Sequence, residues 1–86
     1  MNRRTLVLKL KKFLVEKLEN TKGGFVTVNI TMFCNKYFPY DYISCIKIAS
    51  SYIRELRNDS IREKKIVVAK DRLKQFVNTL NAGSAS

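Results

Sequence analysis

The chain of 86 residues has no histidine, and its seven acidic residues are scattered along the sequence. Histidine is the side chain most often used for general acid–base catalysis near neutral pH, and it is a common zinc ligand. A two-metal nuclease needs clustered carboxylates, and Asp59 with Glu63 is the nearest approach to such a pair. We therefore predict no catalytic residues, no metal site and no cofactor, and we expect that the protein is not an enzyme.

Cysteine is almost as scarce, because Cys34 and Cys45 are the only two. Two cysteines without histidine cannot complete a structural zinc site, and they are too few for a disulfide framework. Both fall in apolar, periodic segments, which favours buried free thiols that pack as small hydrophobic side chains. A reversible disulfide between them is the alternative.

Long apolar runs are also missing. Lys9, Lys11 and Lys12 interrupt the first apolar segment, which excludes the core of a signal peptide and a membrane span. This pattern predicts an intracellular protein, in the cytoplasm or nucleoid, with no membrane partner. A basic amphipathic helix on a membrane surface is the alternative for residues 5–20, but we expect its leucines to pack in a core.

Acidic residues are outnumbered by basic ones, with 7 Asp and Glu against 17 Lys and Arg and a net charge of +10. Self-repulsion of this size opposes a compact state, and binding to a polyanion would relieve it. Nucleic acid is the commonest polyanion inside a cell, and a small, strongly basic domain is typical of proteins that bind it. An anionic membrane surface is the second candidate.

Two adjacent glycines and a single proline divide the chain into segments, and the spacing of apolar residues in each segment indicates a helix or a strand. Helices are predicted at residues 5–20, 32–38 and 42–57, and a last helix is predicted at residues 73–80. Strands that pair with each other are predicted at residues 25–30 and 66–69. The expected N-caps of the last three helices are Thr31, Asp41 and Asp71. The fold class is therefore α+β, mostly α, with one domain at residues 1–82 and a flexible tail at residues 83–86.

The helix predicted at residues 42–57 has two different faces. One face is apolar and is expected to pack in the core; it consists of Ile43, Ile46, Ala49, Ser50, Ile53 and Leu56. The other face is polar and contains no acid; it consists of Ser44, Lys47, Ser51, Arg54 and Asn58. Hydroxyl, amine and guanidinium groups on one line can donate hydrogen bonds to phosphates and base edges. A plain solvent-exposed face is the alternative.

The order helix, strand, helix, helix, strand, helix resembles the winged helix-turn-helix family of DNA-binding proteins over residues 5–70. The resemblance implies a small two- or three-stranded sheet and a second helix that enters the major groove of double-stranded DNA. The turn Pro39-Tyr40-Asp41 lacks the glycine often found there, and no glycine-rich turn marks a wing hairpin. The small, basic, Lys-, Ile-, Asn- and Tyr-rich chain also resembles DNA-binding proteins of archaea and their viruses.

The family's contacts can be carried over to positions in this chain. The recognition positions implied by the resemblance are Ser44, Lys47, Ser51 and Arg54. The wing charges that it implies are Arg62, Lys64 and Lys65. Further basic and phenolic side chains near the two-helix unit are expected to contact phosphates, namely Lys36, Tyr40, Tyr42 and Arg57.

Many winged-helix proteins bind DNA as dimers, which implies a possible homodimer here. The candidate interface is the apolar face of the last helix, formed by Leu73, Phe76, Val77 and Leu80; the alternative is that this face covers the core. The expected function is that of a DNA-binding transcriptional regulator or chromatin-associated factor. The alternative function is a protein-interaction module or an accessory subunit of a nucleic-acid-processing complex.

Overall fold

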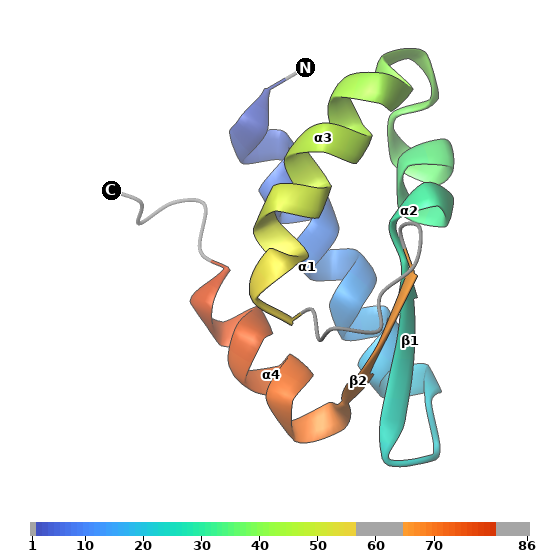
Figure 1. Cartoon of the computed structure of the whole chain (residues 1–86), viewed down its shortest axis with the longest axis vertical. Coiled ribbons are helices and arrows are strands. Elements are labelled where there is room, and N and C mark those ends of the chain that lie inside the picture. The colour runs from blue at the N-terminus through green and yellow to red at the C-terminus, as the bar shows by residue number, and fades with distance from the viewer. Residues whose placement is uncertain (1, 57–64, 81–86) are drawn as a thin grey trace.

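The computed structural model describes residues 2–56 and 65–80. Within these residues the chain forms four α-helices and a two-stranded antiparallel sheet (Figure 1). The elements in order are α1 (Arg3–Asn20), β1 (Phe25–Asn29), α2 (Ile30–Tyr37), the 3-10 turn η1 (Pro39–Asp41), α3 (Tyr42–Ile53), the 3-10 turn η2 (Arg54–Leu56), β2 (Lys65–Ala69) and α4 (Lys70–Thr79). The predicted α+β class, mostly helical, and the predicted order of elements are confirmed.

Two asparagine side chains determine where the first two helices begin. Asn2 precedes α1, and its Oδ1 accepts a hydrogen bond of 2.8 Å from the backbone N–H of Arg4. Asn29 precedes α2, and its Oδ1 accepts a hydrogen bond of 3.2 Å from the N–H of Met32. Each bond satisfies a first-turn amide that has no partner within the helix. The prediction that Thr31 caps the second helix is therefore wrong, because the strand ends earlier than expected and the helix has already begun.

The turn between α2 and α3 is short and is closed by backbone hydrogen bonds. The N–H of Phe38 donates to the carbonyl of Cys34 at 2.9 Å, which ends α2. The proline of the chain then begins η1, in agreement with the predicted break between two helices. Asp41 holds the N-cap position of α3, as predicted, although its side chain makes no capping hydrogen bond to that helix.

The sheet joins two segments that are far apart in the sequence. β1 and β2 pair in antiparallel register, with Val26 opposite Val68 and Val28 opposite Ile66. These four side chains are buried and form the inner face of the sheet. The predicted pairing of the two strands is confirmed.

β2 leads directly into α4. The first amide of the helix, that of Lys70, donates to the carbonyl of Gly24 at 2.9 Å and so ties α4 to the turn before β1. Asp71, predicted as the N-cap, instead lies inside the first turn, and Ala69 holds the cap position. A carboxylate in the first turn still interacts favourably with the helix dipole. The described part of the sheet has two strands, the smaller of the two predicted numbers.

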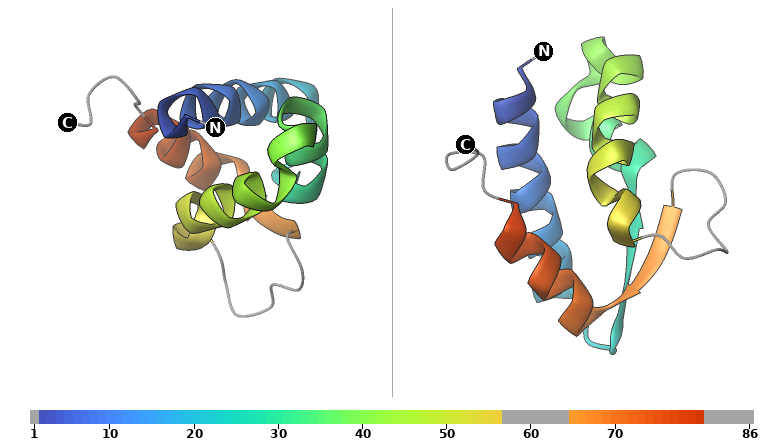
Figure 2. Two further views of the ribbon diagram at one scale, coloured as in Figure 1. Left: turned by 90° about the horizontal axis from the view of Figure 1, so that it is seen from above. Right: turned by 60° about the vertical axis from the view of Figure 1, so that its left-hand side comes forward.

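The core lies between the inner face of the sheet and the helices, with α1, α3 and α4 arranged around it (Figure 2). α1 contributes Leu6, Leu10 and Leu14, which are spaced by one helical turn and are fully buried. Phe33 of α2 is fully buried too, and its ring centroid lies 5.3 Å from that of Phe13. Each helix within the described ranges is too short or too polar to span a lipid bilayer.

The apolar face of α4 points into the core of its own chain. Leu73, Phe76, Val77 and Leu80 are at most 6% exposed, and α4 packs against α1. These side chains therefore take the alternative role considered for them, which is to cover the core. A homodimer would therefore need a surface other than these four side chains.

Cys34 of α2 and Cys45 of α3 form a disulfide, with their Cα atoms 5.7 Å apart. Both residues are fully buried. The favoured expectation of free thiols is wrong, and the alternative of a disulfide is what the structure contains. The cause is tertiary, because the turn η1 brings α2 and α3 into contact at the positions of the two cysteines.

Reduction of this disulfide should destabilise the fold. The bond joins residues with a sequence separation of 11, and closing a loop of that size is expected to add about 3 kcal/mol to the free energy of unfolding by restricting the unfolded chain. Urea denaturation with and without a phosphine reductant measures the difference. The variant Cys34→Ala/Cys45→Ala is the control, since its stability should not respond to the reductant. An unchanged stability of the wild type on reduction would contradict the prediction.

The burial of the apolar side chains of α4 also predicts that the protein is a monomer in solution. We expect light scattering to give a mass near 10.0 kDa for the 86-residue chain, independent of protein concentration. The physical reason is that the apolar face proposed for pairing is already covered within the chain. A mass of about twice that value would contradict this expectation and would require exchange of α4 between chains or pairing through another surface.

Candidate nucleic-acid interface

α3 packs on the core through small and branched side chains. Cys45, Ala49 and Ile53 are spaced by four residues and are buried, and Leu56 of η2 continues their line. Three members of the predicted apolar face, Ala49, Ile53 and Leu56, are therefore confirmed as core residues.

The other three members of that predicted face are not fully buried, and one of them is on the opposite side. Ile46 and Ser50 are half-buried at the edge of the contact. Ile43 is 66% exposed, so its assignment to the core is wrong. The physical reason is that Cys45, bonded to Cys34, is buried, and Ile43, two residues before it, points to nearly the opposite side of the helix. This rotates Ile43 towards solvent.

The solvent side of α3 carries the polar line predicted from the sequence. Ser44, Lys47 and Ser51 are exposed on α3, and Arg54 is exposed at the first position of η2. Their predicted exposure is confirmed, whereas Asn58, the last member of the line, lies outside the described residues. Tyr40 is 99% exposed and lies in η1, three residues before Ile43. We call this surface the α3 face and define it by Tyr40, Ile43, Ser44, Lys47, Ser51 and Arg54.

The hydrogen-bonding capacity of the α3 face is mixed. The hydroxyl of Ser51 donates to the carbonyl of Ile48 at 2.7 Å, so its oxygen is left to accept from a ligand. Lys47 and Arg54 are donors only. None of the six residues of the α3 face is acidic, although the exposed carboxylate of Asp41 lies beside them at the start of α3.

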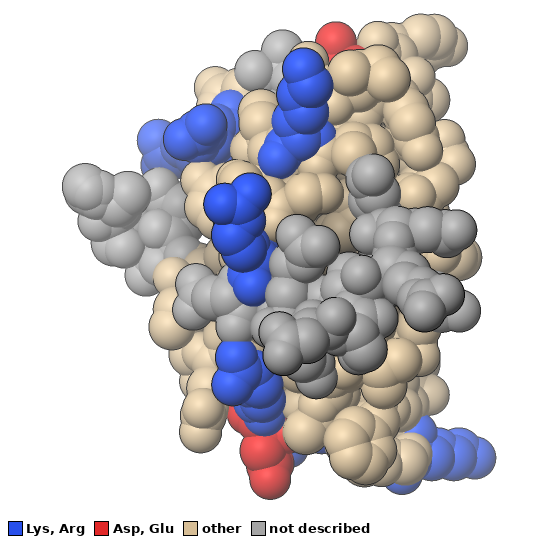
Figure 3. Space-filling model, viewed as in Figure 1, with Lys and Arg blue, Asp and Glu red and all other residues tan. Residues whose placement is uncertain are grey.

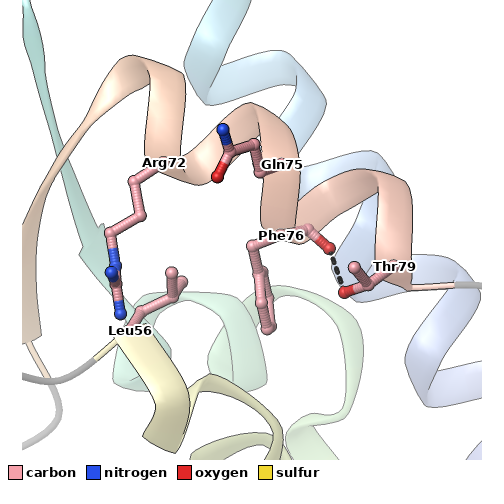
Figure 4. A pocket seen from close by; sticks show the side chains of 5 residues that line it. All are labelled: Leu56, Arg72, Gln75, Phe76 and Thr79. Atoms are coloured by element: carbon pink, nitrogen blue, oxygen red, sulfur yellow. Dashed lines mark hydrogen bonds between the residues drawn. The ribbon is translucent and has the colours of Figure 1, made fainter.

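Positive charge continues from α3 onto α4. In the space-filling view, Lys and Arg side chains follow a line down the face over these two helices, with red carboxylate groups at the two ends of the molecule (Figure 3). Figure 4 shows the guanidinium of Arg72 extending from α4 towards Leu56, two residues after Arg54. The sequence alone does not indicate that Arg72 belongs to this basic surface. Arg72 lies beside the end of α3 because α4 packs against η2.

Arg72 lines a hollow of about 220 Å³ between α4 and η2. The other lining residues are Leu56, Gln75, Phe76 and Thr79 (Figure 4). The Thr79 hydroxyl donates to the carbonyl of Phe76 at 2.6 Å, so its hydrogen is already used. No group of three His, Cys, Asp or Glu side chains able to hold a metal occurs in the described ranges. The polar side chains that line the hollow are thus those of Arg72, Gln75 and Thr79.

The remaining predicted contact residues have different environments. Lys36 is exposed on α2, and its Nζ lies 5.3 Å from the ring centroid of Tyr37. Tyr42 is half-buried and packs against the core, so most of its ring has a structural role. Lys65 begins β2. The other predicted positions, Arg57, Arg62 and Lys64, lie outside the described residues.

Comparisons with protein-family models, with curated proteins and with solved structures found no match to this chain. No relative is therefore at hand from which an activity could be transferred. The chemistry of the α3 face and the net charge of +10 carry the functional argument.

The α3 face should contribute little to stability. Tyr40→Ser and Lys47→Ala should each change the free energy of unfolding by less than about 0.5 kcal/mol, as is usual for exposed positions. Ile53→Ala, on the buried side of the same helix, should cost about 2–5 kcal/mol through lost burial and a residual cavity. Urea denaturation of the three variants measures this contrast. A large loss with Tyr40→Ser would mean that the face has a structural contact.

Proposed function

We propose that this protein binds double-stranded DNA by laying α3 in the major groove, and that it serves as a transcriptional regulator or chromatin-associated factor. The observation that carries the proposal is the exposed, acid-free α3 face on a chain with a net charge of +10. α3 runs from Tyr42 to Ile53, a length of about 18 Å at the rise of an α-helix. The major groove is about 12 Å wide and admits such a helix.

The side chains of the α3 face suit different parts of a duplex. Arg54 has a planar fork of donors that matches the two acceptors of guanine in the major groove, and it is the residue that we propose for a base contact. Lys47 is a compact charge suited to phosphate. Ser44 is short and lies in the first turn of α3, so the backbone there can approach the groove closely.

Charges outside α3 would strengthen this binding. Arg72 extends from α4 towards Leu56, two residues after Arg54, and Lys36 of α2 and Tyr40 of η1 are exposed side chains. Lys65 is the first residue of β2, and the predicted contacts Arg57, Arg62 and Lys64 lie outside the described residues. This arrangement is consistent with a winged helix-turn-helix in which β2, paired with β1, takes the place of a wing hairpin.

A protein-interaction module is the second candidate function. It is favoured by one observation: Tyr40 and Ile43 expose large uncharged surfaces, 99% and 66% of their areas, at the start of α3. Aromatic side chains are enriched at protein interfaces. In this case the basic groups around them would meet an acidic partner rather than a phosphate backbone.

A salt titration of duplex binding separates the two functions. Each neutralised phosphate adds about 0.9 to the magnitude of the slope of log K against log salt, and the candidate contacts lead us to expect a slope of about −4 to −6. Lys47→Ala/Arg54→Ala should weaken binding and lower the magnitude of the slope by about 1 to 2. Fluorescence anisotropy with a labelled 30-base-pair duplex measures both quantities, and electrophoretic shifts on several unrelated duplexes test sequence preference.

The matched control removes the same charge elsewhere. Lys22 lies in the turn after α1, and Lys74 lies on the side of α4 away from Arg72; both are exposed. Lys22→Ala/Lys74→Ala should therefore keep a slope close to that of the wild type. Equal affinities of both double variants and the wild type would reject the α3 face as the contact surface. A complete lack of duplex binding at low salt would reject DNA as the partner and favour the interaction module.

A further inference from the structure

We infer that Ile43 makes the α3 face sensitive to the C5-methyl groups of thymine, so that the protein distinguishes A·T pairs in the major groove. This inference rests on the proposed function and specifies what the α3 face recognises. It starts from the position of Ile43, which is 66% exposed although its spacing along the helix matches the apolar residues. Ser44 and Lys47, one and four residues further along α3, are polar and exposed.

The exposure of Ile43 follows from how α3 is held. Cys45 is fully buried and is bonded to Cys34 of α2. Ala49 and Ile53 are buried on the same side, one and two turns further along. With this side facing the core, Ile43 cannot turn inwards without exposing Cys45. Its side chain is therefore held on the solvent side.

Ile43 lies among groups that suit a duplex. Tyr40 lies in η1, three residues before it, and Lys47 lies one turn after it in α3, and both are exposed. Ser44 is its neighbour in the chain and is too small to prevent close approach. Base readout in helix-turn-helix proteins comes from the N-terminal part of the second helix, and Ile43 lies in the first turn of α3.

The chemistry of the groove selects the ligand. Among the major-groove edges of the four bases, the thymine methyl is the apolar group, and apolar side chains contact it. The exposed Ile43, with Lys47 nearby, is thus suited to the DNA major groove. The phosphates of the groove are anionic, and the thymine methyl groups on its base edges are apolar. A second copy of the chain is a poorer occupant, because symmetric pairing of the two α3 faces would bring Lys47 of one copy near Lys47 of the other.

Replacing thymidine by deoxyuridine tests the inference, because the two differ in the C5-methyl group alone. We would measure binding of the wild type to two 30-base-pair duplexes of the same alternating A·T sequence, one with thymidine and one with deoxyuridine. Burial of one methyl group is expected to give about four-fold tighter binding, so the thymidine duplex should bind at least about four-fold more tightly. Ile43→Ala should bind both duplexes with nearly equal affinity.

Two controls keep the comparison specific. Leu8→Ala removes a similarly exposed aliphatic side chain, 55% exposed, from α1, and it should keep the wild-type preference for thymidine. A second pair of duplexes, of alternating G·C sequence with cytosine or 5-methylcytosine, places a methyl group at the equivalent ring position. The wild type should prefer the methylated duplex, and Ile43→Ala should not.

The possible outcomes separate this inference from the function on which it rests. The inference is overturned if the wild type binds the thymidine and deoxyuridine duplexes equally, or if Ile43→Ala keeps the wild-type ratio of the two affinities. DNA binding with an unchanged ratio leaves the proposed function intact. Failure to bind every duplex at low salt overturns both.

Discussion

The rotation of α3 about its own axis is the constraint on which the exposed surface of this protein depends. Cys45, Ala49 and Ile53 face the core, and the bond from Cys45 to Cys34 holds that side against α2. Because the side of α3 that carries these three residues faces the core, the side chains on its opposite side are exposed to solvent. Lys47 is therefore exposed for the same reason that Cys45 is buried.

The strong positive charge of the chain and its small core are compatible because they are separated in space. The buried side chains of the described residues are all apolar, while Lys and Arg side chains lie on the surface over α3 and α4 (Figure 3). No charge then has to be desolvated on folding, which would be costly. The remaining cost is repulsion between surface charges, and it is lowered by any bound polyanion.

Two kinds of chemistry meet on the α3 face. Its cations attract phosphate without regard to sequence, and its hydroxyl groups, guanidinium and exposed isoleucine can distinguish bases. Arg72 adds charge from α4, beside Leu56 of η2. The helix, the disulfide and the packing of α4 thus cooperate to form one continuous surface from three separate parts of the chain.

The sequence by itself determined the elements, because apolar periodicity, paired glycines and a single proline act over short distances. It also determined the polar line Ser44, Lys47, Ser51 and Arg54, since these positions share one side of any helix there. Tertiary packing alone decided that Cys34 bonds to Cys45, that Ile43 is exposed and that Arg72 lies beside the end of α3. The physical reason is that periodicity defines which residues share a face, whereas contacts with other elements select the rotation of that face and its neighbours.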